Sequence, residues 1–200
     1  MKTFLDSFQR YFLKSFQVVK LDEKLIKELG NDMKALPYAL LILALPSFFN
    51  YGMASLAFRT FVWPEFLLLM LFVLLNVLMF LFMSYLAQYV FKGKQAYSYK
   101  GFLINASLAN VLAWILLIPF ALLLVGVPVK GLFELMLFVV GIWTFVIFFK
   151  LLRILHGLSG FKAFLVVLIS ILVVAGAQGF LMDIFLGEEY KSILLNRMIT

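Results

Sequence analysis

Long apolar runs without charge make up most of this chain, and short charged segments separate them. The first three runs lie between Lys34 and Arg59, between Glu65 and Lys92, and between Lys100 and Lys130. Each is longer than the roughly 20 residues with which a helix crosses about 30 Å of hydrocarbon. The pattern therefore predicts three membrane-spanning helices in the first two thirds of the chain.

Two further spans are predicted in the last third. The run between Glu134 and Lys150 is 15 residues long. Lys150 and Arg153 extend it to about Leu155, because their long stems can stay in the hydrocarbon while their charges reach the interface. The last run covers twenty residues, 163–182. We therefore expect an all-α integral membrane bundle with spans at about 35–58, 66–91, 101–127, 132–155 and 162–183.

The first 34 residues are amphipathic rather than uniformly apolar. One arc of a helical wheel collects Phe4, Leu5, Phe8, Tyr11, Phe12, Phe16 and Val19, and polar residues fill most of the rest. Such a helix is typical of a membrane interface, where its apolar face sinks to the acyl boundary. Residues 1–34 are thus predicted to be a cytoplasmic helical segment. Two interpretations are open. The segment either covers the cytoplasmic end of the bundle, or it senses lipids or binds a soluble partner.

Composition supports a membrane protein and removes several kinds of chemistry. The chain is 65% hydrophobic and 14% charged, with a mean hydropathy of +1.08, which excludes a compact soluble monomer. It has no cysteine and one histidine, which excludes a disulfide framework, a cysteine-ligated metal and a multi-histidine site. We expect no cofactor and no metal.

The distribution of Lys and Arg predicts the orientation. If the amino terminus is cytoplasmic, thirteen of the seventeen basic residues lie on that side. The other side keeps Arg59, Lys130, Lys191 and Arg197. By the positive-inside rule the amino terminus is inside and the carboxyl terminus outside, so residues 186–200 form a short extracytoplasmic tail. The net charge of +7 then reflects topology, and no nucleic-acid partner is expected. No signal peptide is expected either.

Polar side chains inside the spans are amides and hydroxyls only. The absence of Asp, Glu, Lys, Arg and His from the five cores argues against an intramembrane enzyme, which needs such groups. Asn76, Asn105 and Asn110 either join helices through hydrogen bonds or line a polar crevice. Pro46 and Pro119 predict kinks, which are common in carriers and in other membrane helices alike.

Two basic cytoplasmic loops carry the most specific sequence. The first holds Lys92, Lys94 and Lys100, and the second holds Lys150, Arg153, His156 and Lys162. A Gly-Lys turn at residues 93–94, a tryptophan at Trp143 in the fourth span, and the sequence His-Gly-Leu-Ser at 156–159 resemble the Yip-domain family of five-pass membrane proteins. Residues 35–185 would form its membrane domain.

The resemblance implies a five-helix bundle with a cytoplasmic amino terminus. Eukaryotic members are associated with small GTPases, membrane shaping and vesicle traffic rather than with a catalysed reaction. This sequence lacks their long cytosolic amino-terminal region and their Asp-Leu-Tyr-Gly-Pro motif. It therefore looks like a short prokaryotic member, located in the plasma membrane.

The sequence thus favours a non-enzymatic membrane-organising or adaptor protein. Its basic loops would contact anionic lipid headgroups or a protein partner, and the chain could also form homo-oligomers. The alternative is a carrier or channel for a lipid or small solute, which would use the crevice of Asn76, Asn105 and Asn110.

Overall fold

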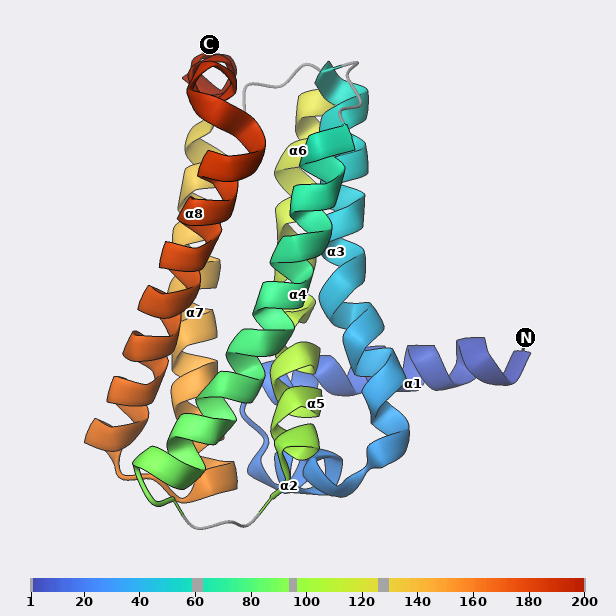
Figure 1. Cartoon of the computed structure of the whole chain (residues 1–200). Coiled ribbons are helices and arrows are strands. Elements are labelled where there is room, and N and C mark those ends of the chain that lie inside the picture. Colours follow the sequence, from blue (N-terminus) through green and yellow to red (C-terminus); the bar gives the residue numbers. More distant parts are fainter. Residues whose placement is uncertain (1, 59–62, 94–96, 126–129, 200) are drawn as a thin grey trace.

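The computed structural model describes residues 2–58, 63–93, 97–125 and 130–199, and every regular element among them is a helix (Figure 1). Four helical stretches are long and apolar enough to cross a membrane. They are Phe66–Val90, Tyr99–Pro119, Gly131–His156 and Gly160–Leu181. A fifth is obtained if Glu23–Asn31 and Met33–Phe49, which meet at 86°, count as one broken span. The all-α fold with several helices suited to a membrane is therefore confirmed.

The helical stretches follow the predicted bounds to within a few residues, except that the last helix extends well beyond its predicted end. In order they are α3 (Leu36–Phe58), α4 (Trp63–Tyr85), the π-helix η2 (Leu86–Val90), α5 (Tyr99–Ala109), the 3₁₀-helix η3 (Asn110–Leu116), α6 (Leu117–Leu124), α7 (Lys130–His156) and α8 (Gly160–Ile199). The third predicted span thus consists of three helical pieces. Pro119 accounts for the end of η3 but not for its start at Asn110, because its ring displaces only the carbonyl of Ile115, four residues earlier. In contrast, α3 continues unbroken through Pro46.

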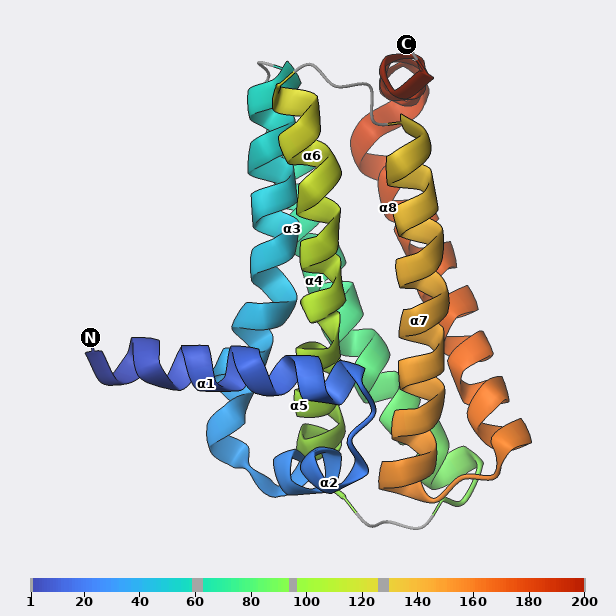
Figure 2. The same ribbon diagram turned by 180° about the vertical axis from the view of Figure 1, so that it is seen from behind.

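The last helix is longer than one span. Its 40 residues correspond to about 60 Å at 1.5 Å per residue, twice the hydrocarbon thickness. The carboxyl-terminal end of α8 turns, so that it is seen nearly end-on in both ribbon views (Figure 1, Figure 2). Residues 186–199 of the predicted tail therefore continue this helix.

Two amphipathic helices precede the first long apolar helix. They are α1 (Lys2–Val19) and α2 (Glu23–Asn31), and the short 3₁₀-helix η1 (Met33–Ala35) joins α2 to α3. Asp22 caps α2 by accepting from the Leu25 amide, and Asp32 caps η1 by accepting from the Lys34 amide. Figure 2 shows α1 running across the bundle in front of α5, with α2 at one end of the bundle. We call this end the inner end.

Helix α1 packs into the bundle along one side. Tyr11 and Val18 are buried, the Phe12 ring lies edge-on to Trp114 with centroids 5.6 Å apart, and Trp143 Nε1 donates to Val19 O at 3.2 Å. The exposed apolar side chains of α1 are Phe4, Leu5, Leu13 and Phe16. The predicted aromatic arc is therefore divided between the protein, against which Tyr11 packs, and the surroundings, while Val18, which lies outside that arc, is also buried.

The core lies in the inner half of the molecule, around α5. Every residue from 101 to 109 is buried, and α5 contacts α1, α2, α3, α4 and α7. Of the apolar window in Tyr99–Pro119, 56% is buried, compared with 22% in each of the other three spans. Helix α5 is therefore the centre around which the inner end is assembled. In contrast, no residue is buried over 131–143 of α7 or 171–181 of α8.

Candidate lipid-binding end of the bundle

Two short loops meet at the inner end. Lys92 and Gly157 both have positive φ angles, 51° and 60°, and each turns the chain just after a helix. The Gly93 amide donates to Ala87 O at 2.8 Å. A Cβ on Gly93 would lie 2.8 Å from both Ala87 O and His156 O, so only glycine fits between them. Lys162 Nζ donates to Phe91 O at 3.1 Å. The loops are thereby held against each other.

Four basic side chains are exposed around these loops, and we call them the basic face. They are Lys92, Lys100, Arg153 and Lys162. Lys150 is half-buried, and Lys94 lies outside the described residues. The Arg153 guanidinium lies 5.7 Å from the centroid of the Phe149 ring. Within the described ranges none of the four has a carboxylate within 4 Å, so their charges are available to an anionic surface.

His156 does not belong to this basic face. Its side chain is fully buried, its Nε2 lies 3.1 Å from Ser84 Oγ, and its ring lies against Phe102 with centroids 5.4 Å apart. The sequence placed His156 in the surface loop, but α7 continues through His156 and the turn begins only at Gly157. The last turn of α7 therefore directs this histidine between α4 and α5.

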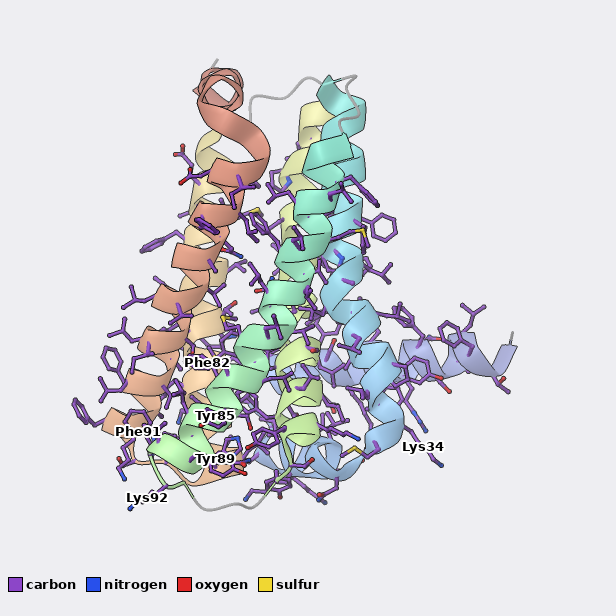
Figure 3. All side chains as sticks on the ribbon, in the orientation of Figure 1. Lys34, Phe82, Tyr85, Tyr89, Phe91 and Lys92 are labelled. Carbon is purple, nitrogen blue, oxygen red and sulfur yellow. The ribbon has the colours of Figure 1, made fainter. Side chains whose placement is uncertain are left out.

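A row of exposed tyrosines at the inner end of α4 was not singled out from the sequence. The Tyr85 and Tyr89 rings have centroids 5.1 Å apart, and Tyr89 and Tyr99 stack at 6.4 Å. Figure 3 shows Phe82, Tyr85 and Tyr89 following one another along α4, with Lys92 beyond them at the tip. The sequence could have indicated this row. Tyr85 and Tyr89 are four residues apart, and they lie at the end of an apolar run just before lysines, where tyrosine is common at a membrane interface.

The three predicted crevice amides bond to three different parts of the protein. Asn76 Nδ2 donates to Phe72 O of its own helix at 2.9 Å. Asn105 Nδ2 donates to Ile26 O of α2 at 3.1 Å and to Gly101 O at 3.0 Å. Asn110 Nδ2 donates to Leu43 O of α3 at 3.1 Å. These bonds favour the interpretation in which Asn105 and Asn110 join helices.

The bond from Asn105 to α2 is expected to stabilise the fold. Asn105→Leu should lower the free energy of unfolding by about 1–2 kcal/mol, because a buried bond between elements is lost. Asn76→Leu is the matched control and should change this free energy by less than about 0.5 kcal/mol, since its amide bonds only within one half-buried turn of its own helix. Denaturation of both purified variants in mild detergent measures the difference. Equal losses would mean that Asn105 does not join α2 to α5.

Tyr11 links α1 to the start of the first long helix. Its hydroxyl donates to Asp32 Oδ2 at 2.7 Å and accepts from Arg10 Nη2 at 3.2 Å, and its ring stacks on Tyr38 with centroids 5.1 Å apart. Burial, together with the bond to Asp32, raises the pKa of Tyr11 above its ordinary value of 10. The hydroxyl therefore stays a donor at neutral pH, and α1 is held at a defined position.

No protein-family model, curated protein or solved structure matches this chain. The likeness to the Yip-domain family consequently stays a prediction from the loop residues. Within the described part of the chain, no group of three or more His, Asp or Glu side chains could hold a metal ion.

Proposed function

We propose that this chain is a non-enzymatic membrane-organising protein that recruits anionic lipids through the basic face at its inner end. In this proposal it is a short prokaryotic-type member of the Yip-domain family in the plasma membrane. The chain crosses that membrane five times, with α3 as the first span, and its amino terminus is cytoplasmic. The distribution of thirteen basic residues on one side and four on the other supports this orientation.

One observation carries the proposal: exposed basic side chains gather at one end, and no carboxylate of the described residues lies within 4 Å of them. Lys92, Lys100, Arg153 and Lys162 surround the two joined loops. Each Lys or Arg close to an anionic leaflet contributes about 1 kcal/mol of attraction. Four such groups on a rigid end suffice to concentrate anionic lipids around the protein.

The proposed position of α1 fits the same surface. Its exposed Phe4, Leu5 and Phe16 would contact acyl chains of the inner leaflet while Arg10 meets headgroups. The contacts of α1 with Tyr38, Trp114 and Trp143 would fix this helix relative to the spans. In this arrangement α1 broadens the inner end of the bundle within one leaflet.

The amide bonds support this function over a carrier. A carrier would need Asn76, Asn105 and Asn110 to face a shared path. Two of the three bond instead to carbonyls of neighbouring elements, and the third bonds within its own helix. A carrier would be favoured if Asn76→Leu abolished the flux of a lipid or solute across reconstituted vesicles while the variant stayed folded.

Replacing the basic face should weaken the recruitment of anionic lipid. The variant with Lys92, Lys100, Arg153 and Lys162 changed to Gln should lose at least about tenfold in affinity for phosphatidylglycerol, since roughly 4 kcal/mol of attraction is removed before screening by salt. The measurement reconstitutes the protein in phosphatidylcholine nanodiscs with increasing phosphatidylglycerol and follows lipid enrichment around it.

The matched control keeps the charge of the basic face, with Lys92, Lys100 and Lys162 changed to Arg. It should retain most of the enrichment. Equal enrichment in the wild type and in the basic-face variant would contradict the proposal. A protein that co-purifies in equal amount and cross-links at Lys162 would instead indicate that the basic face binds a protein partner.

A further inference from the structure

We propose that the inner end of α4 holds one anionic phospholipid in a discrete site. The site, which we call the tyrosine site, consists of Tyr85, Tyr89 and Tyr99 with Lys92 and Lys100. This inference rests on the proposed function and deepens it, because it assigns one tightly held lipid to a particular part of the lipid-recruiting end.

An exposed apolar stripe runs along α4 toward the tyrosine site. It consists of Leu67, Met70, Leu74 and Leu78, each about half exposed. Their spacing of three or four residues places them on one face of the helix. Phe82 continues this face, and Tyr85 and Tyr89 end it (Figure 3). The stripe is long enough to lie along an acyl chain.

The tyrosines lie where headgroups are expected. The apolar span of α4 begins at Phe66, and about 30 Å of hydrocarbon corresponds to roughly 20 residues of helix. Counting from Phe66, that length ends near Tyr85. Tyr85 is 50% and Tyr89 61% exposed, and tyrosine prefers this boundary because its ring is apolar and its hydroxyl is polar.

The backbone presents the three rings as one surface. The π-helix η2 (Leu86–Val90) widens the last turn of α4, and a π-turn inside a membrane helix is frequently found at a functional site. The Tyr99 ring comes from the start of α5 and stacks on Tyr89. Three rings from α4, η2 and α5, rather than a single anchoring tyrosine, therefore face the glycerol region of a lipid.

Charge complementarity identifies the occupant. Lys92 follows the tyrosines on a turn fixed by the Gly93 contacts, and Lys100 is the residue after Tyr99. No Asp or Glu occurs between Glu65 and Glu134, so neither the inner end of α4 nor α5 supplies an opposing carboxylate. The order of apolar stripe, tyrosines and lysines matches acyl chain, glycerol and phosphate in a phospholipid. A soluble phosphate would make no use of the stripe.

Native mass spectrometry of the full chain ejected from nanodiscs that contain phosphatidylglycerol tests the site. We expect one phosphatidylglycerol molecule to stay bound to the wild type. In the double variant Tyr85→Leu/Tyr89→Leu, and in Lys92→Gln/Lys100→Gln, its occupancy should fall by about tenfold. Lys24→Gln/Lys27→Gln makes the same charge change on α2 and should retain the lipid.

Three results would overturn the tyrosine site, and two of them concern lipid retention. One is a wild type that retains no single lipid, and the other is equal retention in the tyrosine variant. Displacement of the lipid by inorganic phosphate alone would also overturn it, because it would show that the stripe plays no part. If the single lipid is absent while anionic lipid still gathers around the protein in the nanodisc, the inference fails and the proposed function stands.

Discussion

Gly101→Ala is expected to lower the free energy of unfolding by about 2–3 kcal/mol, because the new methyl group has no room. A Cβ on Gly101 would lie 2.3 Å from Gly30 O and 3.0 Å from Gly30 C. These are backbone atoms of α2, so no side chain can turn aside. The two helices would have to separate at their crossing, and Asn105 would then lose its bond to Ile26 O.

Gly176→Ala is the matched control for this prediction. No atom lies within 4 Å of the Cβ position at Gly176 in α8, so the same chemical change meets open space. It should leave the stability unchanged or raise it by up to about 1 kcal/mol through helix propensity. Titration of both variants with denaturing detergent measures the difference. If Gly101→Ala unfolds at the same detergent concentration as the wild type, α2 does not pack against α5 as described.

His156→Ala is expected to cost about 3 kcal/mol of stability, comparable to the loss of a large buried aromatic side chain. The imidazole is fully buried beside Phe102, and its removal leaves a cavity where the ends of α4, α5 and α7 meet. It also leaves the buried Ser84 hydroxyl without the partner that lies 3.1 Å away.

A double-mutant cycle separates the energy of the hydrogen bond between Ser84 and His156 from the cost of the cavity. Ser84→Ala and His156→Ala should show a coupling energy of about 1 kcal/mol, because each change removes the same hydrogen bond. Arg153→Ala, one turn earlier in α7 and exposed, should change stability by no more than about 0.5 kcal/mol. Equal effects at Arg153 and His156 would show that the histidine lies at the surface, as its loop sequence suggested.

The long helices could be predicted because their cause is local. A charge-free run of sufficient length has to satisfy its backbone hydrogen bonds within one helix when it lies in lipid. For this reason the predicted spans at 35–58 and 132–155 agree with α3 and α7 to within two residues. The caps at Asp22 and Ser98 are similarly local, since each side chain bonds an amide three residues later.

The inner end could not be predicted from the pattern alone. An amphipathic arc does not reveal whether its apolar side meets lipid or protein, because both are apolar, so the burial of Tyr11 was left open, and the burial of Val18, outside the arc, was not expected. The direction of His156 depends on which residue ends α7. Gly30 and Gly101 are distant in sequence, yet α2 and α5 cross where these two glycines meet. The sequence around either glycine does not indicate that the other one packs against it.

We propose that α3 is a span and that the chain crosses the membrane five times with its basic face in the cytoplasm. The sequence has no cysteine, so single cysteines can be placed at Thr3, Glu134 and Ser159, all of which are exposed. A membrane-impermeant maleimide, applied to oriented vesicles, reports the side of each. Five spans predict that Thr3→Cys and Ser159→Cys react from the cytoplasmic side and Glu134→Cys from the other. Reaction of Thr3→Cys and Glu134→Cys from the same side would mean four spans and would contradict the account.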